Sequence, residues 1–444
     1  MNTHDIADRV ISAVKSRGVA WEVIACVDES TVVSQRLLKP EETLHSRNCQ
    51  VGIRIIIDNK RYSCVSFNDL SKVSDLIDAA ISIASSVPED PYISISDVDG
   101  EYSKDVSGMM LFDDLVVEVA NISKMLTDIE EAALSYDSKI VNSEGASFSH
   151  SKSDIVLATS NGFRGSYKRS RFSTSVSVVS SFNGKMEADY SFSAKNFFAD
   201  LEIPKVLGAD AAARALRRLD ARELKTCKVP VLFENRVASS LLRSFATAIS
   251  GDSIADKTSF LANSMNCSVF RDSVNIIDDP LMRKGLSSRP FDGEGIDSRR
   301  NNVVENGVLK SWLLDMRTAK QLGLQTTGSA VRRSNASVSP DVSNFYVQGT
   351  DISPEELMSD IRIGVYVTDI FGSGVNLATG DYSQGAFGFM IENGKITHPV
   401  HGITVAGNLL EMFADMRVAN DLLFLRSVNA PTLRFDTLVV SGVN

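Results

Sequence analysis

Hydrophobic residues recur with two different periods along residues 1–108, and this pattern predicts a mixed α/β region. The segment before Gly18 is predicted to be a helix, because its apolar residues Ile6, Val10, Ile11 and Val14 recur three or four positions apart. Strands are then expected at residues 23–27, 51–57 and 61–67, with a turn at residues 58–60, and a second helix at residues 70–86. A hinge is expected between residue 88 and residue 108, where Pro, Gly and Asp are frequent.

The clearest strand signal in the chain lies between residues 172 and 192. Apolar or β-branched residues alternate with serines along Phe172, Thr174, Val176, Val178 and Phe182. Asn183-Gly184 then predicts a tight hairpin turn, since both turn residues must accept positive φ. Met186, Ala188, Tyr190 and Phe192 continue the alternation on the return strand. We therefore expect a hairpin with one apolar face and one serine-rich face, the latter meeting water or a lumen.

The remaining patterns predict an α+β fold. Helices are expected at residues 113–135 and from Pro204 to Arg218, and glycine-turned strands dominate from Val269 onward. Two similar hairpins are expected, one at Asn306-Gly307 and one at Asn393-Gly394. We divide the chain into an N-terminal α/β domain at 1–108, a helix-plus-hairpin middle segment at 109–222 that can merge with it, and a strongly curved antiparallel, barrel-like C-terminal β domain at 223–444.

Composition and charge narrow the choice of function. The chain has 444 residues, 43% of them hydrophobic, and a formal net charge of −10. Its basic residues are scattered, whereas an electrostatic nucleic-acid site needs a basic stripe, so no nucleic-acid partner is expected. No stretch approaches the roughly 20 apolar residues of a membrane span, and the N-terminus does not resemble a signal peptide. The five cysteines form no Cys-x-x-Cys pair, which fits a reducing compartment, and we expect a cytoplasmic protein.

The C-terminal half carries a set of short motifs whose order and spacing resemble those of the TldD/PmbA family, also known as modulators of DNA gyrase. The motifs are residues 258–261, Pro290 to Gly295, Asn306 to Leu309, residues 319–323, Thr327-Gly328, Thr379 to Ala386, Ile391 to Ile396 and Ile403 to Asn408. The likeness is clear over about residues 228–444 and extends to the N-terminal half only in general layout.

Within this family, the TldD branch has a helix with an HExxxH zinc motif that a Gly-Asp closes. Aligning this chain on Gly251-Asp252 places Leu242 at the first His, Arg243 at the Glu and Thr247 at the second His. Leu and Arg do not ligate zinc, and Arg stays protonated, so it cannot act as a general base. The family's C-terminal Cys is also absent around residues 426–431. The helix is thus expected to be a vestigial metal-site helix, with neither metal nor catalytic residues in this chain.

This loss of ligands is similar to the PmbA, or TldE, branch of the family. The resemblance implies a non-catalytic subunit of a zinc metalloprotease that trims or degrades unfolded peptides, including microcin-type precursors. A TldD-type partner would supply the zinc in a heterodimer. One alternative is a stand-alone homodimeric protein that binds peptides or assists assembly. A weaker alternative is a metallopeptidase with rebuilt ligands.

Eight further residues are candidates for a peptide channel or subunit interface by the same resemblance: Asp292, Glu294, Gly295, Thr327, Gly328, Gly380, Asp381 and Tyr382. Asp292 and Glu294 also form a possible acid–base pair. Their Gly-rich surroundings favour a turn with solvated acids instead. His398 and His401, three apart on a strand, are expected to face opposite sides and not to share a metal.

Overall fold

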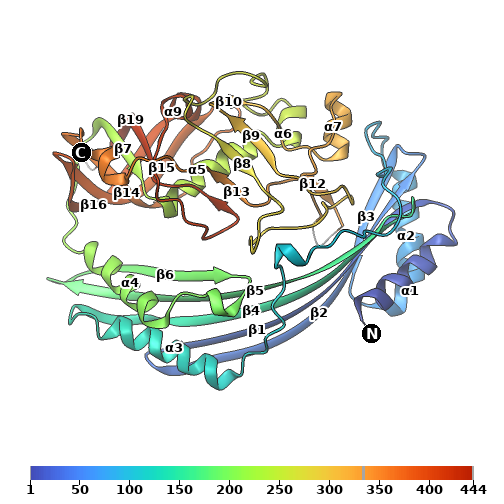
Figure 1. The fold of residues 1–444 in the computed structure, drawn as a ribbon, viewed down its shortest axis with the longest axis horizontal. Helices are drawn as coiled ribbons and strands as arrows, with labels where there is room; N and C mark the ends of the chain where they lie inside the picture. Colours follow the sequence, from blue (N-terminus) through green and yellow to red (C-terminus); the bar gives the residue numbers. More distant parts are fainter. Residues whose placement is uncertain (1, 333–335, 443–444) are drawn as a thin grey trace.

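The computed structural model describes residues 2–332 and 336–442. The N-terminal half forms a long curved sheet, and the C-terminal half lies against the inner face of that sheet (Figure 1). The fold is therefore α+β, as the hydrophobic patterns predict. Among the described residues, no helix has the length and apolar character needed to cross a membrane.

The curved sheet contains six antiparallel strands in the order β3-β2-β1-β4-β5-β6. Their bounds are β1 (Ala20–Arg36), β2 (Lys39–Ile57), β3 (Arg61–Phe67), β4 (Ile140–Thr159), β5 (Arg164–Phe182) and β6 (Lys185–Lys195). The predicted strand at 23–27 is only the start of β1, which has 17 residues. Strands from 1–108 and from 109–222 thus build one sheet, and the boundaries at 108 and 222 stay predictions.

Four helices pack on one face of this sheet: α1 (Thr3–Lys15), α2 (Val73–Ser86), α3 (Val119–Leu134) and α4 (Pro204–Arg217). Successive side chains of a strand point to opposite faces. Along β1, Val23, Ala25 and Val27 pack beneath α1 and α2. Ile24, Cys26 and Asp28 point to the opposite face, toward the C-terminal half. The strand pattern therefore separates a helix-covered core from the face on which the site is built.

The predicted turns are confirmed, and one predicted helix is too long. Asn183 and Gly184 both have positive φ and join β5 to β6. Pro204 begins α4, as expected for a first helical position. The helix predicted at 113–135 begins only at Val119, so that prediction was wrong at its start. The carboxylate of Asp113 accepts hydrogen bonds from the backbone of Leu115 and Phe198, and these bonds hold it outside the helix.

The predicted apolar face of the β5–β6 hairpin is confirmed for β5 and wrong for β6. Val176 lies opposite Ser191, and Val178 opposite Asp189, so the apolar face of β5 continues as polar residues on β6. Ser191 is buried there because its hydroxyl donates to Asp210 of α4. Met186 and Tyr190 share the serine-rich face and are exposed. The polar face of β6 is buried because it bonds to the covering helix α4, and the alternation of residue types does not reveal such hydrogen bonds.

The C-terminal half is built around a closed five-stranded barrel in the order β16-β15-β14-β7-β19, which closes because β19 also pairs with β16. The bounds are β7 (Cys227–Phe233), β14 (Ile363–Phe371), β15 (Asp381–Glu392), β16 (Lys395–Asn408) and β19 (Leu433–Ser441), with β17 (Arg417–Val418) added at β19. The predicted barrel is confirmed, although β7 and β14 run parallel. Asn393-Gly394 turns β15 into β16 with both φ values positive, as predicted.

A second sheet in this half has the order β10-β9-β8-β13-β18, beside a small hairpin of β11 and β12. Their bounds are β8 (Ile276–Asp278), β9 (Asn301–Glu305), β10 (Val308–Leu309), β11 (Ala330–Arg332), β12 (Val338–Pro340), β13 (Phe345–Val347) and β18 (Val428–Asn429). Helix α5 (Asn235–Ala248) packs between this sheet and the barrel, and the short helices are α6 (Gly251–Ala255), α7 (Met316–Leu322), α8 (Pro354–Met358) and α9 (Leu409–Asp415). The second predicted hairpin is also confirmed, at Asn306-Gly307.

A buried cluster of four charged residues joins the two halves. Glu22 on β1 and Arg54 on β2 are opposite each other in the sheet, and their side chains are 2.7 Å apart. Arg332 of β11 contacts the same Glu22 carboxylate at 2.5 Å, and Glu294 lies 3.6 Å from Arg54. All four side chains are at most 4% exposed. Glu22 thus contacts two guanidinium groups, and two of the contacts in this cluster run between the halves.

An aromatic contact next to this cluster brings the halves into close approach. Phe291 of the C-terminal half packs against Tyr102, Phe163 and Tyr167, with ring centroids 5.1–5.4 Å apart. Gly165 permits this contact, because a Cβ atom there would lie 2.6 Å from the Phe291 ring. The segment Phe291 to Glu294 thus docks the C-terminal half on the sheet.

We expect Glu22→Gln to destabilise the protein by about 3–5 kcal/mol, since it leaves two buried guanidinium groups around a neutral amide. Glu29→Gln is the matched control on the same strand: Glu29 pairs with Arg47, and both side chains are more than half exposed. The control should cost below about 1 kcal/mol. Denaturant unfolding followed by tryptophan fluorescence measures both, and equal small losses would contradict a structural role for the cluster.

Candidate functional site

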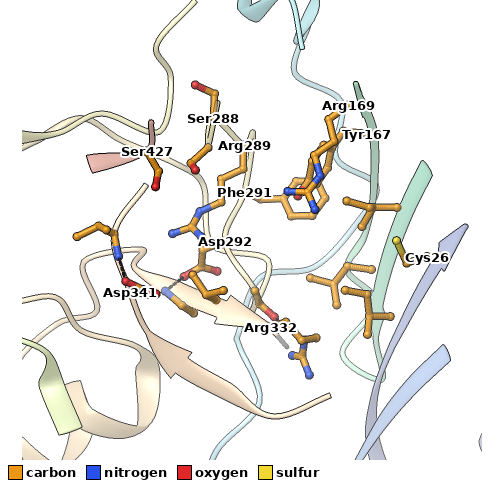
Figure 2. Close-up of a pocket in the computed structure, with 18 of the residues that line it drawn as sticks. Cys26, Tyr167, Arg169, Ser288, Arg289, Phe291, Asp292, Arg332, Asp341 and Ser427 are labelled. Carbon is orange, nitrogen blue, oxygen red and sulfur yellow. Dashed lines mark hydrogen bonds between the residues drawn. The ribbon is translucent and has the colours of Figure 1, made fainter. Parts of the chain in front are cut away.

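The candidate site is a cavity of about 670 Å³ between the curved sheet and the C-terminal half. Strands β1, β2, β4 and β5 form one wall with residues such as Cys26, Leu157 and Arg169. Helix α5, the loop at 287–293, β11 and residues 426–428 form the other wall. Figure 2 shows side chains from both walls converging on this space. The cavity thus exists only because the two halves are docked.

Helix α5 presents Ser239, Ser240 and Arg243 to the cavity, and Ser427 lies on the same wall. These are the two segments that resemble the metal-binding parts of the TldD branch. Arg243 is held by Asp341 through two parallel hydrogen bonds of 2.7 and 2.9 Å, an arrangement that fixes the guanidinium. The polar groups that meet here are a paired guanidinium and hydroxyls.

Leu242 and Thr247, at the two histidine positions of the motif, have structural contacts instead. Leu242 is 3% exposed and belongs to the hydrophobic core of the C-terminal half. The Thr247 hydroxyl donates to the carbonyl oxygen of Arg243 one turn earlier. Across the described ranges, no three His, Cys, Asp or Glu residues are grouped so that they could hold a metal ion. A catalytic zinc needs three such ligands and an open position, and the described residues do not fit that requirement.

Asp292 and Glu294 are buried, 2% and 1% exposed, so the prediction of solvated acids was wrong. The Asp292 carboxylate accepts hydrogen bonds from the backbone N–H groups of Glu294, Ile296 and Ala330. Glu294 accepts one from the backbone of Met316 and faces Arg54. The prediction rests on the usual exposure of turns. In the structure, the carboxylates of Asp292 and Glu294 instead connect their turn to β11, α7 and β2. Gly295, with φ +80, packs against Phe163 in the same turn.

Burial raises the pKa of Glu294; Arg54 opposes the shift, and the nearby Asp292 carboxylate adds to it. Burial also raises the pKa of Asp292, opposed by Arg289. In contrast, burial acts to raise the pKa of Glu22, but Arg54 and Arg332 outweigh it and lower that pKa. Glu22 therefore stays ionised, and Glu294 is the member of the cluster that holds a proton most easily.

The other sequence candidates lie outside the cavity wall, and their roles in a channel or interface remain predictions. Thr327 accepts a hydrogen bond from the backbone of Leu314, and Gly328 follows it with φ +70. Gly380 and Asp381 lie where β15 begins, and Tyr382 is buried in the barrel core. His398 and His401 both lie in β16.

Several cavity residues were missed in the sequence. Arg289, Arg169 and Cys26 come from segments far apart in the chain and belong to no motif, so only the fold brings them together. Burial and the neighbouring Asp28 raise the pKa of the Cys26 thiol to about 12. The thiol is therefore protonated at neutral pH, and a nucleophilic role is disfavoured.

Comparison with known proteins agrees with this architecture. Models of the PmbA/TldA metallopeptidase match in three parts: domain 1 at residues 21–84, the central domain at 112–219 and the C-terminal domain at 226–442. The chain is 34% identical over 413 residues to the metalloprotease PmbA of Escherichia coli O157:H7, covering 92% of this chain and 89% of that protein.

Solved structures share the whole fold. A crystal structure from Bacteroides thetaiotaomicron, described as a modulator of DNA gyrase, superposes with a TM-score of 0.89 at 25% identity, covering 99% of both chains. TldE from Thermococcus kodakarensis has the same fold, with a TM-score of 0.85, 18% identity and 99% coverage of both chains. The fold is that of a curved sheet docked on a five-stranded barrel. By sequence, the chain belongs to the PmbA/TldD metallopeptidase family.

The raised pKa of Glu294 predicts a pH dependence of stability. The folded state holds this proton more tightly than the unfolded chain, whose Glu pKa is about 4.5, so the free energy of unfolding should fall as pH rises from about 5 to about 8. Glu294→Gln keeps an acceptor for the Met316 N–H group and removes the titration. Its unfolding free energy, measured in denaturant across this range, should fall less than that of the wild type. A parallel decrease in both proteins would show that another group causes the dependence.

Proposed function

We propose that this chain is a non-catalytic, TldE-like subunit of a zinc metallopeptidase that acts on unfolded peptides. The observation that carries the proposal is the state of α5. Where the resemblance to the catalytic branch places two histidines and a glutamate, this helix has a core leucine, a guanidinium paired with Asp341 and a threonine bonded to its own helix. None of these groups can bind zinc or accept a proton from a zinc-bound water.

In this proposal a TldD-type chain supplies the metal and the general base. Family membership supports the proposal, as does the fold shared with a protein named TldE. This chain contributes a second wall of the chamber that receives the peptide. An extended peptide can also be held along exposed strand edges, which pair with backbone irrespective of sequence. The edge strands of the curved sheet are β3 and β6.

The test is co-expression with the TldD-type chain of the same organism, followed by co-purification and peptide-cleavage assays. We expect cleavage by the mixture, none by this chain alone, and zinc in the complex at one ion per TldD-type chain. Replacing the glutamate of the partner's HExxxH motif should abolish cleavage.

Three results would contradict the proposal. Full cleavage by this chain alone would show that it is catalytic, and stoichiometric zinc in the isolated chain would show rebuilt ligands. A stable homodimer that never associates with a TldD-type chain would favour a stand-alone peptide-binding protein.

A further inference from the structure

We propose that the cavity between the two halves binds a carboxylate carried by an apolar peptide, with Arg289 as its main contact. The inference goes beyond the proposed function, because the cavity lies wholly within this chain and its ligand can be measured without a partner. It names the chemical group that the site recognises, namely a free C-terminal carboxylate or an acidic side chain.

Arg289 is the central residue of the proposed site, because part of its guanidinium is buried without a hydrogen-bond partner. Its Nε and Nη2 atoms are inaccessible to solvent and have no hydrogen-bond partner among the residues that the structure describes. Arg289 lines the cavity, and Figure 2 shows its side chain amid the labelled residues of both walls. Buried guanidinium groups are normally paired, and an incompletely paired one in a cavity wall is suited to an anion that enters the cavity.

The protein's own carboxylates near Arg289 are already engaged. Asp292 and Asp278 are close enough for Arg289 to lower their pKa values against the larger effect of burial. However, the Asp292 oxygens accept three backbone N–H groups, and Asp278 accepts the backbone N–H and the hydroxyl of Ser343. These acids balance part of the charge of Arg289 without satisfying its hydrogen bonds.

The cavity as a whole favours an anion. Five arginines and three aspartates line it, although the chain has a net charge of −10. Two of the five are committed elsewhere, since Arg243 pairs with Asp341 and Arg332 with Glu22. Arg169 is an exposed side chain on the opposite wall, so a bound carboxylate would have Arg289 and Arg169 on two sides. Positive charge concentrated in a cleft attracts and holds anions.

The remaining wall selects an organic anion over a simple ion. Ile24, Ile155 and Leu157 of the sheet face Phe291, Val331 and Val342 of the C-terminal half. A volume of about 670 Å³ is within the range of about 300–1,000 Å³ that holds drug-sized ligands. A short apolar peptide segment ending in a carboxylate fits this combination of apolar walls and arginine side chains.

The test measures fluorescence anisotropy of short apolar peptides, labelled at the N-terminus, with the isolated full-length chain. Three peptides of one sequence are compared: a free acid, a C-terminal amide, and an amide with one internal glutamate. We expect the free acid to bind about tenfold or more tightly than the neutral amide, as for a charged hydrogen bond. Recovery of affinity by the glutamate peptide assigns the site to carboxylates in general, and no recovery assigns it to the C-terminus. Equal binding of all three peptides would overturn the proposal.

Two variants tie the preference to the cavity. Arg289→Gln should remove the preference for the free acid, whereas Arg283→Gln, an exposed arginine of the same loop outside the cavity wall, should retain it. Ser427→Asp keeps Arg289 and places a competing carboxylate on the wall, so it should also weaken free-acid binding. If Arg289→Gln fails to fold, Ser427→Asp provides the test. An unchanged preference for the free-acid peptide in Ser427→Asp would contradict the inference. If the peptides show no preference for a carboxylate, the proposed function is still tested separately by peptide cleavage with the two-chain mixture.

Discussion

The buried cluster of Glu22, Arg54, Glu294 and Arg332, with ionised Glu22 between two guanidinium groups, is the constraint on which the arrangement of the molecule depends. A charge inside a protein is tolerated only when a partner of opposite sign is held in good geometry. Here Glu22 and Arg54 come from the sheet, and Glu294 and Arg332 from the C-terminal half. If the halves separated, Glu22 and Arg54 would keep each other, but Arg332 would lose Glu22 and Glu294 would lose Arg54. The docked arrangement is therefore the state in which the cluster has all four of its members in contact.

The same docking creates the cavity. Phe291, Asp292 and Gly293 form part of its wall, and the next residue, Glu294, enters the ion cluster. One short segment thus holds the halves together and shapes the space between them. A change in the cluster is expected to affect both stability and ligand binding, and only measurements on folded protein can separate the two effects.

Local patterns in the sequence predicted local structure well. Asn183-Gly184, Asn306-Gly307 and Asn393-Gly394 each form the hairpin turn that their tolerance of positive φ indicates. The helix spacing before Gly18 and the apolar alternation of β5 were also correct. Contacts across the chain were not predictable in this way. Arg332 reaches Glu22 across 310 positions, and the buried serine face of β6 depends on hydrogen bonds to α4. Arg289 belongs to no sequence motif, and only the fold places it in the cavity between the two halves.

Helix α5 has one face that packs in the core and another that lines the cavity. Its buried face, which includes Ala238, Leu241 and Phe245, packs in the core of the C-terminal half. Packing therefore constrains this face whatever chemistry the other face performs. Arg243 on the opposite face is exposed, lines the cavity and pairs with the half-buried Asp341. A scaffold of this kind can keep the packed face of its helix while the residues on the other face differ.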